Sequence, residues 1–215
     1  MRNKKQIIDR IRSEKLIAIL RLNAQESVQP AVDALVAGGM QVMEITTNTP
    51  GFAEEITKAR ERHPEMLIGA GTVTTFEMAQ KVIAAGAQFL VTPNAHRKVA
   101  ELGKAEHIPI LMGAMTPTEV ANALAFGADI IKLFPAGTLG IPHYQSLKGP
   151  FNDVPFFAVG GIDKNNIEDW LEVGIDGIGL GSGLVKSAVR TKADFRQVTT
   201  QAEGFRKQVM ANSKK

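Results

Sequence analysis

The chain has 215 residues, of which 44% are hydrophobic and 22% charged, and its net charge of +3 comes from 25 basic and 22 acidic side chains. These proportions are those of a globular protein, and a small positive excess without a basic, aromatic-rich stripe argues against nucleic-acid binding. The chain has no cysteine, which excludes disulfides and thiolate metal sites, and its apolar runs are too short to span a membrane. We therefore expect a cytoplasmic protein with neither a nucleic-acid nor a membrane partner.

Eight short apolar runs predict eight buried strands. In chain order they are "LIAIL" (16–20), "QVMEIT" (41–46), "LIGAGTV" (67–73), "FLVTP" (89–93), "PILMGA" (109–114), "IIKLFPA" (130–136), "FFAVGGI" (156–162) and "GIGLGS" (177–182). Runs this short and this apolar are typical of parallel strands that are covered on both faces.

Helix signals separate these runs. Segments 27–39, 74–87, 116–128 and 164–175 are amphipathic, with Thr75 as a candidate N-cap, Pro117 in a first turn, and Gly86 and Gly127 as helix stops. The alternation predicts one (β/α)8 TIM barrel over residues 1–215, with frayed basic tails at about 1–5 and 211–215. An open doubly wound sheet is the competing fold, but its glycine-rich turn is missing after the first run, where "RLNAQES" follows.

Lys132 interrupts the apolar run "DIIKLFPA" (129–136). If it points into the barrel, it shares a face with Ile130 and Phe134 near the C-terminal ends of the strands, where TIM-barrel active sites lie. Burial would lower the pKa of its amine, and a neutral amine can attack a ketone to form a Schiff base. The alternative is a structural lysine whose stem packs while its ammonium group reaches water or a carboxylate.

Glu44 is a second charge within an apolar run, between Met43 and Ile45. By strand parity it shares a face with Val42 and Thr46, so an inward face would bring it into the barrel with Lys132. It would then either transfer protons during Schiff-base chemistry or form a simple ion pair with the lysine.

Glycine-rich turns end the last two predicted strands. Gly160, Gly161, Gly181 and Ser182 would let backbone N–H groups approach an anion, and barrels often bind phosphate in these two turns. We therefore predict a phosphate cradle there, although glycine also serves tight turns.

Three further residues follow predicted strands. Thr72 could bind a carboxylate or hydroxyl of a substrate, Pro93 could simply end its strand, and Arg21 could meet either an anionic substrate or a surface carboxylate. The histidines His63, His96, His107 and His143 form no metal-binding motif, and no P-loop or G-x-S-x-G turn occurs. We expect no metal and no cofactor.

The ordered set "EITTNTP", "GAGTV", "LVTPN", "IKLFPA", "FFAVGGI" and "GLGSG" resembles the class I aldolases that cleave 2-keto-3-deoxy-6-phosphogluconate (KDPG), its galactonate epimer or 4-hydroxy-2-oxoglutarate (KHG). The resemblance extends from "LIAILR" to "GLGSGLV". It implies that Lys132 forms a Schiff base with pyruvate and that Glu44 is the general acid and base. It also implies that Thr72 contacts the pyruvate carboxylate and that Pro93 and Phe134 line the pocket.

The same resemblance assigns the phosphate to Gly160, Gly161 and Ser182. It implies a lyase that releases pyruvate and an aldehyde, such as glyceraldehyde 3-phosphate or glyoxylate, and that assembles as a homotrimer. Many gluconate-type members carry an arginine where this chain has Asn48; asparagine there, together with Arg21, is more similar to galactonate-type members. Two alternatives stay open: a sugar-phosphate isomerase or epimerase on the same barrel, and a noncatalytic barrel that binds a metabolite.

Overall fold

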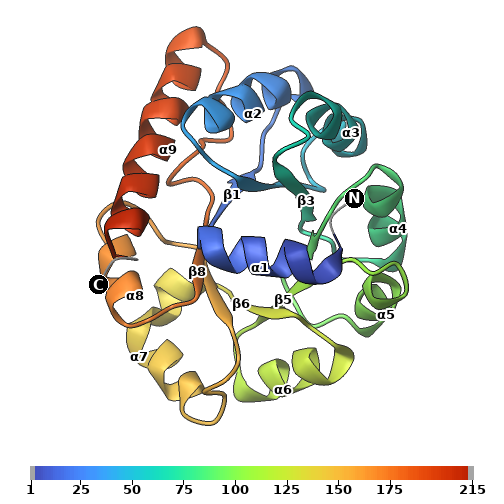
Figure 1. Cartoon of the computed structure of the whole chain (residues 1–215), viewed down its shortest axis with the longest axis vertical. Helices are drawn as coiled ribbons and strands as arrows, with labels where there is room; N and C mark the ends of the chain where they lie inside the picture. The colour runs from blue at the N-terminus through green and yellow to red at the C-terminus, as the bar shows by residue number, and fades with distance from the viewer. Residues whose placement is uncertain (1–2, 213–215) are drawn as a thin grey trace.

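A computed structural model describes residues 3–212, which form a closed barrel of eight parallel strands in chain order (Figure 1). The barrel closes where β1 pairs with β8, with Ala18 opposite Leu180. The strands are β1 (Leu16–Leu20), β2 (Val42–Thr46), β3 (Leu67–Gly71), β4 (Leu90–Val91), β5 (Ile110–Ala114), β6 (Ile130–Leu133), β7 (Phe156–Val159) and β8 (Gly177–Leu180). The predicted TIM barrel and its eight strands are thus confirmed, and the open sheet is excluded.

Helices lie around and across the barrel, and all but the first and the last connect successive strands (Figure 1). They are α1 (Lys4–Glu14), the short 3₁₀ helix η1 (Gln25–Ser27), α2 (Val28–Ala37), α3 (Phe52–Arg62), α4 (Phe76–Ala84), α5 (Arg97–Ala105), α6 (Pro117–Phe126), α7 (Ala136–Lys148), α8 (Ile167–Glu172) and α9 (Lys192–Asn212).

The helix-end signals act as the sequence predicts. The Thr75 side chain accepts a hydrogen bond from the backbone of Met78, and Thr116 forms a reciprocal capping box with Glu119. Gly127 ends α6 with a φ of 99°, in the left-handed region that glycine adopts easily. Local chemistry therefore fixes where these helices begin and end.

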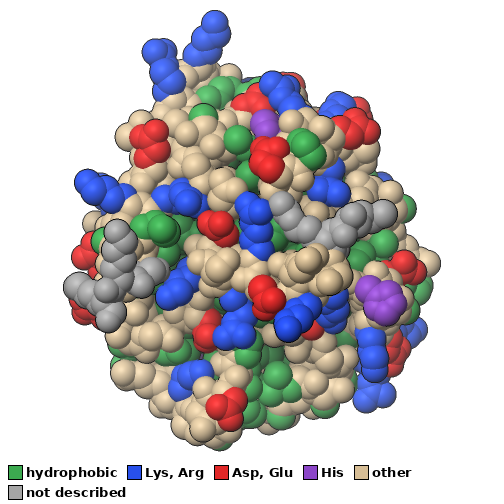
Figure 2. Space-filling model, in the orientation of Figure 1, with side chains coloured by type: hydrophobic (Ala, Val, Ile, Leu, Met, Phe, Trp, Pro, Cys, Tyr) green, Lys and Arg blue, Asp and Glu red, His purple; other side chains and the backbone are tan. Residues whose placement is uncertain are grey.

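Helix α1 closes the N-terminal end of the barrel, which the strand pattern did not predict. Ile7 and Ile11 of α1 cluster with side chains from the early part of the strands, including Ile17, Val42 and Ile130. In Figure 1, α1 crosses in front of the barrel, and Figure 2 shows acidic and basic side chains interspersed over this face. The interior is open to a ligand from the other, C-terminal end.

The expected tails are shorter than predicted where the structure describes them. Lys4 and Lys5 belong to α1, which Asn3 caps through a reciprocal hydrogen-bonded pair with Gln6, and residues 211 and 212 belong to α9. The remaining tail residues lie outside the described part of the chain. Within residues 3–212, no helix combines the length and apolarity that crossing a membrane requires.

Candidate active site

Lys132 lies on β6 with only 5% of its surface exposed, beside Gly113 of β5 and Phe157 of β7. Its neighbour along the same face, Ile130, belongs to the hydrophobic cluster inside the barrel. The amine of Lys132 lies 5.1 Å from the ring centroid of Phe134, a residue that is 38% exposed at the mouth. The predicted inward face is therefore correct, and the lysine does not extend to bulk water.

Glu44 lies on β2 and is 2% exposed. A β-carbon on the neighbouring Gly71 would collide with the Glu44 carboxylate, so the glycine provides the space that this carboxylate occupies. Within residues 3–212, no salt bridge of 4.0 Å or less joins Glu44 to Lys132. The two groups influence each other's charge without the simple ion pair that the sequence left open.

Burial shifts the pKa values of both groups toward their neutral forms. It lowers the pKa of the Lys132 amine; the negative charge of Glu44 opposes this shift, while the positive charge of Arg21 adds to it. Burial raises the pKa of the Glu44 carboxyl, and Lys132 and Arg21 oppose that shift. The site thus favours a neutral amine, which is the nucleophilic form. It also favours the protonated form of the Glu44 carboxyl group, which can donate a proton and, once ionised, is a stronger base than an exposed glutamate.

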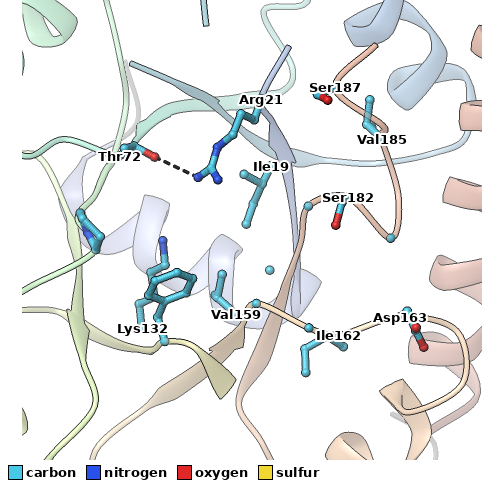
Figure 3. Close-up of a pocket in the computed structure, with 17 residues that line it drawn as sticks. Ile19, Arg21, Thr72, Lys132, Val159, Ile162, Asp163, Ser182, Val185 and Ser187 are labelled. Atoms are coloured by element: carbon cyan, nitrogen blue, oxygen red, sulfur yellow. Dashed lines mark hydrogen bonds between the residues drawn. The ribbon is translucent and has the colours of Figure 1, made fainter. Parts of the chain in front are cut away.

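A cavity of about 510 Å³ opens above Lys132 at the C-terminal ends of the strands (Figure 3). Of the residues predicted from sequence, all except Glu44 and Asn48 line it. The lining residues are Ile19, Arg21, Thr72, Pro93, Lys132, Phe134, Val159, Gly160, Gly161, Ile162, Asp163, Gly179, Gly181, Ser182, Gly183, Val185 and Ser187.

Arg21 and Thr72 meet on one side of this cavity. The Arg21 Nη2 donates a hydrogen bond of 3.3 Å to the Thr72 hydroxyl, and Figure 3 shows the guanidinium extending over the space near Lys132. A cation and a hydroxyl that converge in this way form a suitable site for a carboxylate.

The glycine turns after β7 and β8 form the opposite side. Gly160 and Gly161 have φ values of 89° and 74°, a region that side chains disfavour. A β-carbon on Gly160 would lie 3.0 Å from the Phe134 ring, whereas one on Gly181 would have no neighbour within 4 Å. These glycines and Ser182 line the cavity together, and the anion cradle predicted for them stays a prediction.

Asn48 is not among the residues that line this cavity, and its place in the substrate site stays a prediction. It is exposed in the turn that follows β2, outside the cavity lining. Strand parity could not place it, because the alternation of sides ends with the strand at Thr46.

Sequence reasoning also missed several lining residues. Ile19, Val159 and Gly179 lie near the ends of β1, β7 and β8, where inward parity could have identified them. Asp163 is an acidic group at the cavity edge, and its carboxylate accepts a hydrogen bond of 2.8 Å from the backbone of Asn165. No motif distinguished it from an ordinary loop residue.

Burial lowers the pKa of Lys132, and a carboxyl group lies in the same barrel interior. This arrangement is typical of an enzyme that acts on carbonyl compounds through an amine. The sequence model of the KDPG and KHG aldolase family matches residues 7–201. The chain belongs to this family and is a class I, Schiff-base aldolase, which confirms the resemblance and sets the isomerase and noncatalytic alternatives aside.

The relatives include enzymes of both sugar series. The chain is 35% identical to 2-dehydro-3-deoxy-phosphogluconate aldolase of Treponema pallidum over 92% of this chain and 94% of the relative. It is 32% identical to 2-dehydro-3-deoxy-6-phosphogalactonate aldolase of Escherichia coli, over 90% and 96%. A KDPG aldolase from Legionella pneumophila, solved with pyruvate as a covalent carbinolamine, superposes with a TM-score of 0.82 at 31% identity, covering 88% of this chain and 93% of that one.

The positive charge of Arg21 should contribute to the lowered pKa of Lys132. Replacing the guanidinium in Arg21→Leu removes a cation that disfavours the ammonium form, so the Lys132 pKa should rise and less neutral amine should exist at neutral pH. The measurement is the rate at which acetic anhydride, a neutral reagent, labels Lys132 across a pH series, read by peptide mass.

The matched control is Arg196→Leu, which removes an exposed arginine of α9. Its labelling curve should coincide with that of the wild type. An Arg21→Leu curve that stays in place or moves to lower pH would contradict the assignment.

Proposed function

We propose that this aldolase cleaves a 2-keto-3-deoxy-6-phospho sugar acid of the gluconate or galactonate type into pyruvate and glyceraldehyde 3-phosphate. The observation that carries the proposal is the position of Lys132. Its buried amine lies in a cavity lined by Arg21 and Thr72 on one side and by the glycine turns after β7 and β8 on the other. A substrate with a carboxylate at one end, a ketone beside it and a phosphate at the far end matches that order.

In the proposed mechanism, the neutral amine of Lys132 attacks the C2 ketone. The protonated carboxyl group of Glu44 donates its proton to the departing hydroxyl, so that loss of water gives an iminium ion and leaves Glu44 as a carboxylate. Glu44 accepts the proton of the C4 hydroxyl, and the C3–C4 bond breaks as its electrons move into the iminium. The aldehyde leaves, while pyruvate remains attached as an enamine. Protonation of C3 and hydrolysis of the iminium release pyruvate and restore the amine. Because the lysine accepts the electron pair, the mechanism uses no metal or organic cofactor.

The other residues serve to bind the substrate. Thr72 and Arg21 hold the carboxylate next to the reacting ketone. The phosphate lies against the turns that contain Gly160, Gly161, Gly181 and Ser182, and Pro93 and Phe134 flank the chain between the two ends.

Arg21 is the arginine on the cavity wall, and Asn48 lies outside it. The identity of one residue, at position 48, does not by itself decide between the gluconate and galactonate series. A homotrimeric assembly and a cytoplasmic location stay predictions from the sequence and its family resemblance.

Borohydride trapping tests the assignment of Lys132. Incubation with pyruvate and reduction should leave one stable pyruvate adduct, located on Lys132 by peptide mass, and Lys132→Met should give none because it lacks the amine. Lys186→Met, which removes an exposed lysine outside the cavity, is the matched control and should label like the wild type. Folded wild-type protein that forms no adduct would refute the proposal.

Glu44→Gln separates imine formation from carbon–carbon cleavage. The amide keeps the shape of the side chain but does not accept the C4-hydroxyl proton, so kcat for cleavage should fall by about 10²- to 10⁴-fold while trapping with pyruvate persists at least in part. Steady-state kinetics and adduct mass provide the two readouts. Cleavage at the wild-type rate would remove Glu44 from the mechanism.

A substrate panel tests the phosphate and the stereochemistry. KDPG, its galactonate epimer, their nonphosphorylated forms and 4-hydroxy-2-oxoglutarate are compared by kcat/KM. We expect about a hundredfold preference for the phosphorylated acids, because charge-assisted hydrogen bonds to a phosphate contribute on that scale. Ser182→Ala should reduce that preference and leave the nonphosphorylated acids unchanged; equal rates with and without phosphate would disprove the cradle.

A further inference from the structure

Thr72 has an unusual backbone conformation for its residue type. Its φ is 57°, in the left-handed region that β-branched residues rarely occupy because their side chains collide with the backbone. Such a conformation persists where the surrounding structure imposes it, and it is frequent at ligand-binding positions.

This conformation takes Thr72 out of the β3–β4 hydrogen-bond ladder. The Ala70 N–H donates to the Phe89 carbonyl at 3.0 Å, and a regular parallel ladder would next use Thr72, two residues along. Instead, the Val73 N–H donates to the Val91 carbonyl at 3.1 Å. The extra residue bulges at the mouth, where the Thr72 side chain lines the cavity.

Thr47, in the turn after β2, holds this bulge from the other side. Its hydroxyl donates a 2.6 Å hydrogen bond to the Thr72 carbonyl, and its backbone N–H donates a 2.9 Å hydrogen bond to the Gly71 carbonyl. Thr47 is 9% exposed and does not line the cavity. One residue thus anchors two successive peptide groups, and water has little access to replace the hydroxyl bond.

The anchored peptide also determines where the Thr72 hydroxyl lies. That hydroxyl accepts the 3.3 Å hydrogen bond from Arg21 and faces the cavity (Figure 3). If the peptide rotated toward an ordinary β conformation, the hydroxyl would leave this position. Arg21 would then lose its partner.

We propose that Thr47 is a positioning residue, which fixes the left-handed Thr72 so that its hydroxyl and Arg21 together receive the substrate carboxylate. This inference rests on the proposed function, in which Thr72 and Arg21 bind that carboxylate. Thr47 acts through Thr72 and does not touch the substrate.

Thr47→Val tests the inference, because valine has the shape of threonine but no hydroxyl. The measurement is the pyruvate concentration that gives half-maximal borohydride-trapped adduct on Lys132. We expect Thr47→Val to raise it about tenfold, the scale associated with a displaced substrate-binding group, and Thr47→Ser to restore it to near the wild-type value. Thr47→Ala serves as a second variant if the valine protein does not fold.

Two comparisons distinguish a specific effect on the position of the Thr72 hydroxyl from a general destabilisation of the protein. Thr199→Val removes a hydroxyl that also donates to a backbone carbonyl, that of Ala34 at 3.0 Å, and should leave the pyruvate dependence unchanged. In the condensation direction, Thr47→Val should raise KM for pyruvate but not for glyceraldehyde 3-phosphate, which binds at the opposite side of the cavity. Equal increases for both would overturn the proposal.

A double-mutant cycle tests the route through Thr72. Thr72→Gly accepts a positive φ without strain and lacks the hydroxyl, so adding Thr47→Val to it should have no further effect on half-saturation. Additive effects would contradict the proposal, as would an unchanged half-saturation in Thr47→Val alone. Failure of the wild type to form any adduct would instead refute the proposed function, so the two failures are distinguishable.

Discussion

The site depends on the burial of one amine. A parallel barrel encloses its interior with apolar side chains, and Lys132 is placed among them near the ends of the strands, where desolvation disfavours the ammonium ion. The same surroundings raise the pKa of Glu44. Both shifts favour neutral side chains, although the charged forms would attract each other. Burial is therefore the larger influence on both groups, and the nucleophile and the group that transfers protons result from the same constraint.

Strand periodicity was sufficient to predict this part of the site. The eight apolar runs correspond to eight strands, and parity predicted that Lys132 and Glu44 would share one interior if each faced inward. Both conclusions follow from the two-residue repeat of a strand, which leaves one choice of face once the core side is known. The N-terminal helix was missed because its mean composition is polar, and only Ile7 and Ile11 reveal its contact with the barrel.

Beyond the strands, the sequence had less predictive power. Asn48 lies two residues past the end of β2, in a turn where strand alternation no longer applies, so its spacing from Glu44 carried no information about its direction. Thr47, its neighbour, turns inward and binds the Thr72 carbonyl. No local pattern separates these two residues. The difference between them arises from tertiary contacts with the bulge after β3, which a single sequence does not encode in any short motif.

The position of Arg21 links substrate binding to the chemistry of the lysine. Its charge contributes to the lowered pKa of Lys132, and this favours the neutral amine that attacks a ketone. The iminium that forms next is a cation, which the same guanidinium would destabilise. A substrate carboxylate bound between Arg21 and Thr72 would offset that charge when the iminium forms. The carboxylate would then contribute to catalysis as well as to binding, because its negative charge would balance the positive charge of the iminium formed at the adjacent ketone. Acids with a carboxylate next to the ketone are therefore the substrates that supply the negative charge needed between Arg21 and the iminium.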